Sequence, residues 1–206
     1  VEADQKYVIC NADEGEPGTF KDRLIMEGDP HKVLEGMAIC GYAIGASKGY
    51  IYIRGEYKLS IERTRRAIDD ARRMELLGEG LFGSDFSFDV EVKIGAGAYV
   101  CGEETALIES MEGKRGNPRL KPPFPAQVGY LGKPTNVNNV ETLATVPAIL
   151  RKGATWFRSF GTEGTPGTKV YTIIGHVDRP GLIEVSTGIT LREIIADYSG
   201  GMAGGE

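Results

Sequence analysis

The stretch that decides the fold is GAGAYVCGEET, residues 95–105. An alternating apolar run from Phe88 to Ile94 precedes it and predicts a strand. The apolar residues between Thr105 and Glu112 predict a short helix that ends before Gly113. A glycine-rich turn between the carboxyl end of a strand and the amino end of a helix is where open α/β sheets bind ligands.

Two familiar phosphate-binding motifs do not fit this turn. A dinucleotide fingerprint requires a third glycine at position 100, which is Val100. A phosphate loop ending at Gly102 would continue with lysine and then serine or threonine, but Glu103 and Glu104 follow. Carboxylates would repel a triphosphate, whereas they suit a helix start and accept hydrogen bonds from hydroxyl or amide groups. A charged helix start without any ligand also explains them.

A second polar loop follows an earlier strand. Residues Lys6–Cys10 predict a short apolar strand, and NADEGEPG (residues 11–18) is too acidic and too rich in turn residues to continue it. Asn11 offers both a donor and an acceptor, as needed to bind an amide-like ring edge or a sugar hydroxyl, whereas the acidic residues offer acceptors only. The alternative is a solvated acidic turn with an Asx-type backbone bond at Asn11.

The order of the predicted elements indicates a parallel α/β sheet. Helices are expected from Pro30 to about Ile44 and, capped by Ser60, to about Leu77, with a strand at Tyr50–Arg54 between them. Strands alternating with helices at these lengths are typical of a parallel sheet. Right-handed crossovers place the loops after all three strands along one edge. We therefore expect residues 11–18 and 95–105 to face each other across one cleft.

Further polar segments lie downstream. Residues 114–125 form a basic, proline-rich loop that suits a phosphate-bearing ligand or plain solvation, and Phe124 in it either stacks on a planar ring or anchors the loop. Three asparagines within residues 136–139 precede a helix expected over Val140–Lys152. Asn139 suits an N-cap. Because a cap needs only one amide, the other two favour a ligand contact.

A change to glycine, threonine and proline around residues 159–167 predicts a domain boundary. Beyond it, strands are expected at Thr168–Gly175 and Gly181–Val185, followed by a helix from Leu191 to about Tyr198 with Thr190 as its cap. A hairpin and one helix cannot close a core alone. The chain is therefore expected to be an internal fragment whose second domain is cut short.

Composition limits the class of function. A net charge of −5 and a pI near 5.3 argue against nucleic acid or an anionic membrane surface as the main partner. No apolar run reaches the ~18 residues of a spanning helix, so direct membrane insertion is not expected. Cys10, Cys40 and Cys101 have no CxxC spacing, which favours buried thiols in a reducing cytoplasm and disfavours an iron–sulfur or zinc site within the chain.

Three blocks make the chain resemble a known family. They are NADEGEPGTFKDR (11–23), GAGAYVCGEETALIESMEGKRGNPRLKPPFP (95–125) and PTNVNNVETLATVP (134–147). The chain resembles the flavin-carrying, NADH-oxidising subunit of respiratory complex I and the matching subunits of NAD(P)-linked hydrogenases and formate dehydrogenases. The similarity spans essentially the whole chain.

The resemblance implies two domains. Residues 1–162 would form an FMN- and NAD(H)-binding α/β domain that lacks its N-terminal glycine-rich loop. Residues 163–206 would begin a ubiquitin-like β-grasp domain. A four-iron iron–sulfur cluster is expected in a C-terminal part that the chain lacks, and the isolated piece is expected to be inactive.

The resemblance also implies an activity and a set of partners. The protein would be an oxidoreductase that takes a hydride from NADH or NADPH and passes electrons singly through FMN to iron–sulfur clusters. Its partners would be iron–sulfur subunits of a multisubunit oxidoreductase, including a small thioredoxin-like two-iron subunit. Its location would be the cytoplasm or the cytoplasmic face of a membrane complex.

By family correspondence, Glu16 and Glu104 are the candidate catalytic residues. The resemblance assigns cofactor binding to Asn11, Asp13, Glu14, Glu16, Tyr99, Gly102, Glu103, Glu104, Lys121, Phe124, Asn138 and Asn139. No metal ligand is assigned within the chain.

Two other classes of function stay open. The chain would be a non-catalytic assembly or binding module if the acidic cleft were unused, and a purified full subunit without yellow colour would favour this. Alternatively, the carboxylates of the two loops would hold Mg²⁺ for hydrolysis. Metal-dependent turnover without a flavin spectrum would favour that second class.

Overall fold

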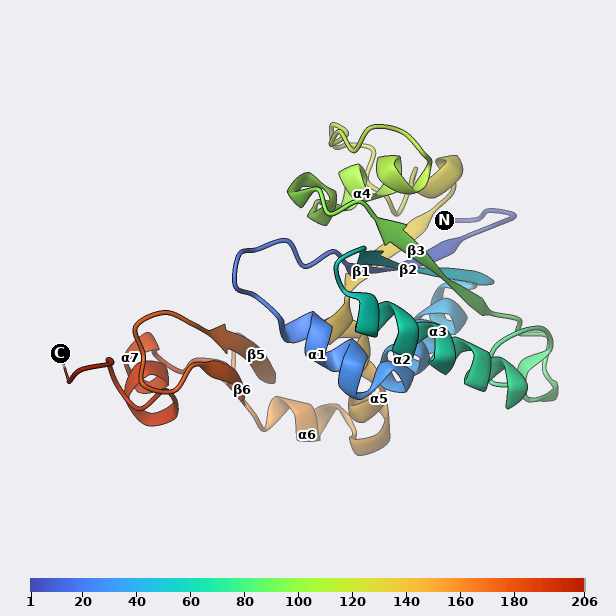
Figure 1. Ribbon diagram of the computed structural model, residues 1–206. Helices are drawn as coiled ribbons and strands as arrows, with labels where there is room; N and C mark the ends of the chain where they lie inside the picture. Colours follow the sequence, from blue (N-terminus) through green and yellow to red (C-terminus); the bar gives the residue numbers. More distant parts are fainter. Residues whose placement is uncertain (206) are drawn as a thin grey trace. The chain divides into compact units, whose positions relative to one another are not determined.

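The computed structural model describes residues 1–205, which form two compact units (Figure 1). The first unit contains residues 1–16 and 22–147, and the second contains residues 17–21 and those from 148 onward. All residues that were predicted to bind cofactors lie in the first unit.

The first unit is built on a four-stranded parallel sheet. Its strands are β1 (Tyr7–Ala12), β2 (Lys48–Arg54), β3 (Asp89–Gly95) and β4 (Thr135–Asn139). Their order across the sheet is β3-β2-β1-β4, and every neighbouring pair is parallel. The predicted α/β class with a parallel sheet is confirmed. The pattern of residues did not reveal β4, because asparagine is depleted in strands.

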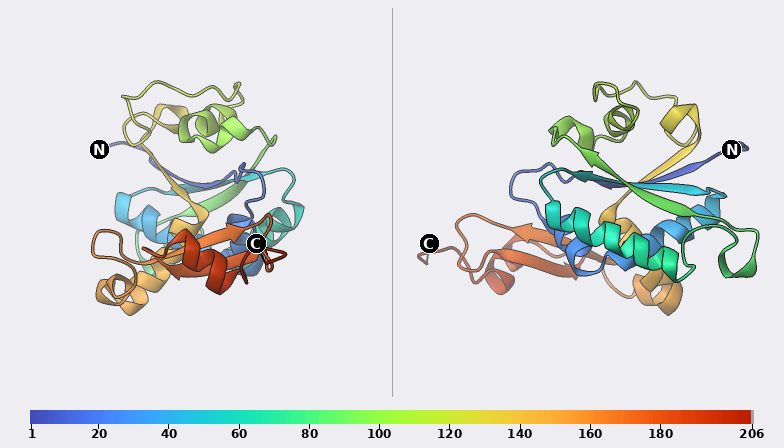
Figure 2. Two further views of the ribbon diagram at one scale, coloured as in Figure 1. Left: turned by 90° about the vertical axis from the view of Figure 1, so that its left-hand side faces the viewer. Right: turned by 45° about the vertical axis from the view of Figure 1, so that its right-hand side comes forward.

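Helices cover both faces of this sheet. They are α1 (Lys21–Gly28), α2 (Pro30–Ile44), α3 (Lys58–Arg73), α4 (Glu104–Met111) and α5 (Val140–Lys152). Figures 1 and 2 show α2 and α3 on one face and α4 on the other. Because successive strand residues point to opposite faces, Val8 packs in the core under α2 and α3, whereas Ile9 packs with Leu107 of α4.

Several element boundaries differ from the expectations. β1 continues through Asn11 and Ala12, because Ala12 is buried and Asn11 pairs in register with strands on both sides. The predicted cap Ser60 lies inside α3, where it is buried and its hydroxyl donates to Glu27 Oε1 at 3.3 Å. α3 also ends at Arg73 rather than near Leu77. The boundaries expected for α5 are confirmed.

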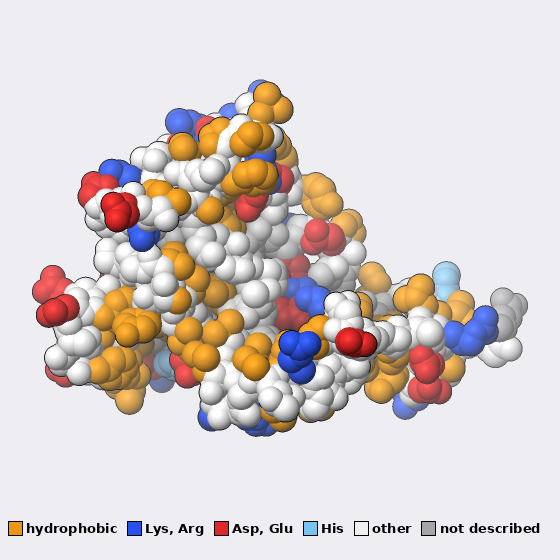
Figure 3. Space-filling view, turned by 180° about the vertical axis from the view of Figure 1, so that it is seen from behind, with side chains coloured by type: hydrophobic (Ala, Val, Ile, Leu, Met, Phe, Trp, Pro, Cys, Tyr) orange, Lys and Arg blue, Asp and Glu red, His pale blue; other side chains and the backbone are white. Residues whose placement is uncertain are grey.

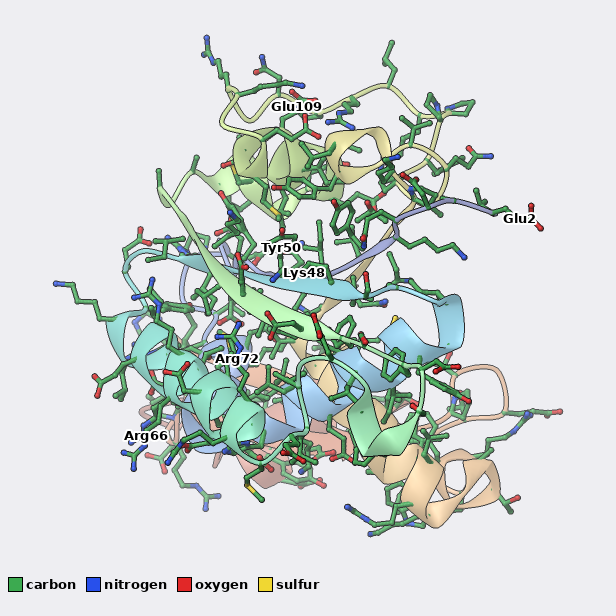
Figure 4. The ribbon with its side chains drawn as sticks, turned by 90° about the vertical axis from the view of Figure 1, so that its right-hand side faces the viewer. Glu2, Lys48, Tyr50, Arg66, Arg72 and Glu109 are labelled. Carbon is green, nitrogen blue, oxygen red and sulfur yellow. The ribbon has the colours of Figure 1, made fainter. Side chains whose placement is uncertain are left out.

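Charged side chains of α3 tie this helix to the sheet edge and to solvent. Two nitrogens of Arg72 donate to the carboxylate of Asp89 in β3, both at 2.8 Å. Figure 4 shows Arg72 directed toward the sheet and Arg66 directed away from it. In the same view Lys48 and Tyr50 lie together on β2, where the Lys48 ammonium is 5.9 Å from the centroid of the Tyr50 ring.

The second unit contains a hairpin and short helices. β5 (Thr168–Ile173) pairs antiparallel with β6 (Gly181–Ser186), after α6 (Ala154–Arg158) and before α7 (Leu191–Glu193). Thr190 caps α7, because its hydroxyl accepts a hydrogen bond from Glu193 N while the Glu193 carboxylate accepts one from Thr190 N. The expected hairpin and its capped helix are confirmed. The boundary at residues 162 and 163 and the β-grasp assignment stay predictions.

The surface carries charges of both signs. On the face seen in Figure 3, acidic and basic side chains are interspersed and apolar side chains gather in patches between them. Large apolar residues exposed in the first unit include Tyr42, Met74 and Phe82. None of the helices within residues 1–205 has the length and apolar character needed to span a bilayer.

Candidate functional site

The segments that follow β1 and β3 meet at the carboxyl edge of the sheet. The side-chain amide of Asn11 donates to the carbonyl oxygen of Gly102 at 2.8 Å, which joins the end of β1 to the turn before α4. The ring of Tyr99 lies so close to Gly15 that a Cβ there would come within 3.0 Å of Tyr99 Cδ2. The predicted approach of these two segments is therefore confirmed.

Asp13 is buried at this edge with one oxygen unpartnered. Asp13 is only 8% exposed, and its Oδ2 has no hydrogen-bond partner within residues 1–205. Burial raises the pKa of Asp13 to about 6, a rise that Arg54 opposes and that Glu56 and Glu16 reinforce. Because a buried polar atom without a partner is costly, Oδ2 is suited to accept a hydrogen bond from a bound molecule.

Glu14, the next residue, is engaged inside the protein. It is 3% exposed, and its carboxylate accepts hydrogen bonds from Asp22 N at 3.0 Å and Arg23 N at 3.3 Å, at the start of α1. The hydroxyl of Tyr57 donates to the same carboxylate at 3.1 Å. Glu14 thus satisfies orphan amides of α1 from the loop that precedes this helix. Its side chain supports the loop, so a contact with a cofactor would have to use its main chain.

Glu103 is the N-cap of α4. Its carboxylate accepts hydrogen bonds from Thr105 N at 2.8 Å and Ala106 N at 2.9 Å. Burial alone would raise the pKa of Glu103, but the bonds from Thr105, Ala106 and Lys121 hold it below its ordinary value of 4.5. The Lys121 ammonium lies 3.0 Å from Glu103 and 2.5 Å from Glu104. The charged helix start is thus real, and one lysine bridges both carboxylates.

The remaining predicted nucleotide contacts lie open to solvent in the first unit. Tyr99 is 67% exposed and Phe124 is 53% exposed, while Glu16 is also exposed. The exposed aromatic rings offer stacking surfaces to a ligand, and the carboxylates and lysine of these segments offer polar contacts.

β4 brings the asparagines alongside β1. In the register Asn139 is opposite Asn11, and Asn138 is opposite Cys10. The Asn139 amide donates to Asp22 Oδ2 at 2.7 Å, and its oxygen accepts a bond from Glu141 N at 3.0 Å. Asn139 therefore caps the start of α5, as one interpretation of the sequence suggested, and also reaches α1. Asn138 donates to Asn136 Oδ1 at 2.5 Å.

Sequence reasoning missed the residues behind the two loops. Arg54 donates through Nη1 to the carbonyl oxygen of Glu14, and its guanidinium lies 5.8 Å from the centroid of the Tyr57 ring. The guanidinium of Arg23 lies 5.6 Å from the same ring. The available signal was position, since Arg54 ends a predicted strand at the edge where the polar loops were expected.

Comparison with known proteins identifies the family of this chain. The model of the Nuo51 FMN-binding domain matches residues 1–148. The chain belongs to the Nuo51 FMN-binding domain family. The expected resemblance is thereby confirmed.

Among its relatives in the Nuo51 family, the chain is 62% identical over 204 residues to the NADP-reducing hydrogenase subunit HndC of Solidesulfovibrio fructosivorans, covering 99% of this chain and 41% of that protein. It is 54% identical over 200 residues to the mitochondrial NADH dehydrogenase (ubiquinone) flavoprotein 1 of Dictyostelium discoideum, covering 97% of this chain and 42% of that protein. The chain thus spans less than half the length of these relatives.

A solved structure shows the same fold. The crystal structure of an air-oxidized NAD⁺-reducing [NiFe]-hydrogenase matches with a TM-score of 0.87 and 44% sequence identity. The match covers 97% of this chain and 33% of the hydrogenase chain.

Proposed function

We propose that this chain is the flavin- and nucleotide-binding part of a subunit that oxidises NADH or NADPH and passes electrons through FMN to iron–sulfur clusters. The observation that carries the proposal is the buried, unpartnered Oδ2 of Asp13 at the edge where the loops meet. An acceptor in that position suits an N–H or O–H donor of a flavin nucleotide. FMN supplies the redox chemistry, since a flavin accepts a hydride and can release its electrons one at a time.

We assign the flavin contacts to the sheet edge. Asn11 lies near the end of β1 and Asp13 follows this strand. Asn138 and Asn139 end the neighbouring strand β4. Together they offer amide donors and acceptors next to one ionisable carboxylate. Gly102 and Glu103 contribute the backbone of the adjoining turn, where the Glu103 carboxylate caps α4, and the main chain of Glu14 completes the loop.

We assign the nucleotide contacts to the exposed and half-buried side chains of these loops. Glu16 and Glu104 accept hydrogen bonds from ribose hydroxyls and stabilise the positive charge that develops on a nicotinamide ring as it loses a hydride. Lys121 supplies a cation for a phosphate group. Tyr99 and Phe124 offer exposed rings for stacking on the bases.

The arrangement of the carboxylates does not favour the magnesium-dependent alternative. The Glu14 carboxylate is occupied by protein donors, and that of Glu103 caps α4. Within residues 1–205 no three His, Cys, Asp or Glu residues are grouped so as to hold a metal ion.

We also propose the context in which the subunit works. Its partners would carry iron–sulfur clusters and include a small thioredoxin-like two-iron subunit. Relatives named as a hydrogenase subunit and as an NADH dehydrogenase flavoprotein support membership of a multisubunit oxidoreductase. Exposed apolar residues such as Phe82 support burial of surface in an assembly. We place the complex in the cytoplasm, with a four-iron cluster in the full-length protein. Residues 1–162 would form the flavin and nucleotide domain, and the hairpin and helix of residues 163–206 would begin a β-grasp domain.

The test uses the full-length subunit with Glu16→Gln and Glu104→Gln. Glutamine keeps the shape and one acceptor oxygen but removes the charge, and a charge-assisted hydrogen bond is about twice as strong as a neutral one. Each change should lower kcat/KM for NADH by about five- to thirtyfold, equivalent to roughly 1–2 kcal/mol. The measurement is reduction of an artificial acceptor by NADH, with FMN quantified in the same samples.

The matched control is Glu62→Gln, at an exposed position of α3. It should leave both activity and FMN content unchanged. If activity in the Glu16 and Glu104 variants fell only in proportion to lost FMN, these residues would be scaffold and their assignment to the nucleotide would be wrong.

A further inference from the structure

Arg54 stands between the two loops that form the proposed site. Since β2 lies between β1 and β3, the carboxyl end of β2 is flanked by the segments that leave both neighbours. On one side the Arg54 guanidinium donates to the carbonyl oxygen of Glu14 and has its Nε 3.9 Å from Asp13 Oδ1. On the other side its Nη2 donates to Glu56 Oε1 at 3.2 Å.

Glu56 links Arg54 to the glycine-rich turn that follows β3. Gly97 has a φ of +81°, and a Cβ placed on it would lie 2.4 Å from Glu56 Oε1. The turn after β3 therefore rests against the Glu56 carboxylate. Arg54 is thus linked to both loops, directly on the side of β1 and through Glu56 on the side of β3.

We propose that Arg54 is a positioning residue for the flavin site, where it fixes the two loops relative to each other and keeps the Asp13 carboxylate ionised. The inference rests on the proposed function and goes beyond it by assigning a role to a residue that the motifs do not include. Arg54 acts through Asp13 and Glu14, and each of its three side-chain nitrogens already donates a hydrogen bond within the protein.

The charges around Asp13 predict the direction in which loss of Arg54 would move the pKa of Asp13. Arg54 favours the ionised carboxylate, whereas burial and the carboxylates of Glu56 and Glu16 disfavour it. The pKa of Asp13 is about 6 with Arg54 in place, so loss of this cation would raise it further toward neutral pH. A protonated carboxyl would no longer offer a charge-assisted acceptor at Oδ2. The Tyr52 phenol is a further titratable group that interacts with the Asp13 carboxylate, and the Asp13 charge raises the pKa of Tyr52.

The experiment measures FMN retention by the full-length subunit between pH 5 and pH 9, from flavin fluorescence released after desalting. In the wild type, retention should fall at acidic pH as Asp13 becomes protonated. Arg54→Gln should move the midpoint of this fall upward by about one pH unit or more. Arg54→Lys should move it less, because the charge remains. Asp13→Asn should remove the midpoint, so that Arg54→Gln in the same protein no longer moves one.

Glu56→Gln is the matched control with the opposite sign. It removes a negative charge that disfavours ionised Asp13, so it should move the midpoint downward. A purely structural role would weaken retention at every pH and would not produce opposite shifts. Should Arg54→Gln fail to fold, Arg54→Lys and Glu56→Gln still decide the question.

The outcomes separate this inference from the proposed function. Wild-type protein that binds no FMN at any pH would overturn the proposed function and this inference with it. FMN binding with a midpoint that neither Arg54 nor Glu56 variants move would overturn the role of Arg54 alone.

Discussion

The acidic loop after β1 and the acidic start of α4 place similar side chains in opposite situations. Asp13 is buried with an unpartnered oxygen and has a pKa of about 6. Glu103 receives hydrogen bonds from two backbone amides and from Lys121, which hold its pKa below 4.5. A carboxylate whose lone pairs are met by the backbone serves the fold. One that keeps a buried, unpartnered oxygen is available to a ligand.

The two carboxylates should affect folding stability with opposite dependence on pH. The folded-state pKa of Asp13 lies above its ordinary value of 3.8, so its ionisation destabilises the fold, fully above about pH 6 and not at all below pH 3.8. The folded-state pKa of Glu103 lies below 4.5, so its ionised form stabilises the fold above pH 4.5, and this is lost as the pH falls through the folded value.

The largest effect on stability is expected from Glu14→Gln. Glutamine offers one acceptor oxygen where the carboxylate now serves two amides and the Tyr57 hydroxyl, and its NH₂ group would face donors. We expect a loss of about 2–4 kcal/mol in the free energy of unfolding, measured by urea denaturation at pH 7, because one or two buried donors lose their acceptor. A loss below about 1 kcal/mol would show that Glu14 is not a support of the loop.

Asp13→Asn should stabilise the flavin-free protein and weaken its flavin binding. The gain in the free energy of unfolding should be on the order of 1–3 kcal/mol at pH 8, because the amide avoids the cost of a buried charge. The gain should vanish below pH 4, where the wild-type carboxyl is itself uncharged. FMN affinity should fall by at least about tenfold. The control is Asp69→Asn, at an exposed surface position of α3. A stability gain without any loss of FMN affinity would contradict the ligand role of Asp13.

Glu103→Gln tests the carboxylate that is hydrogen-bonded by backbone amides. Loss of a charged N-cap should cost about 1 kcal/mol at pH 7, measured by thermal unfolding, and the difference from wild type should shrink as the pH falls below 4.5. Glu104→Gln is the neighbouring control, since Glu104 is the first residue of α4 and not its cap. An equal loss in both variants would show that the helix responds to nearby charge rather than to the cap.

The smallest effect on stability is expected from Lys121→Met. Exposed ion pairs contribute little, so the free energy of unfolding should change by no more than about 0.5–1 kcal/mol despite the contacts with Glu103 and Glu104. The KM for NADH should nevertheless rise several-fold, because a phosphate contact is lost. Steady-state kinetics and denaturation on one preparation would separate the two roles. A large loss of stability with unchanged KM would make Lys121 a structural residue.

The parts of the fold that depend on local pattern could be predicted from the sequence. The alternating run before Gly95 and the apolar spacing of α5 indicate their elements without outside help. α1 and β4 could not be found in this way. α1 is short, and its first amides are satisfied by Glu14 from a loop before it. β4 carries asparagines that become strand residues only because β1 lies beside them.

The candidate site also has features that the sequence predicts and features that it does not. Glycine-rich and acidic motifs after two strands of one sheet indicate a shared edge, and the bond between Asn11 and Gly102 confirms it. The contrast between Asp13 and Glu14 is invisible in the sequence, because it depends on which of the two carboxylates the start of α1 uses. Arg54 escaped notice for a similar reason. Its importance comes from neighbouring strands that are distant in the chain.

The position of β4 has a consequence for biosynthesis. β4 joins β1 across 128 residues of chain, whereas β2 and β3 are reached through successive helices. During translation one edge of β1 must therefore stay open until Asn139 has left the ribosome, and an open strand edge is a template for pairing with other chains. The asparagine side of the proposed flavin site is the last part of the sheet to close. A nascent chain stalled before Asn139 is expected to depend on chaperones rather than to form a smaller working domain.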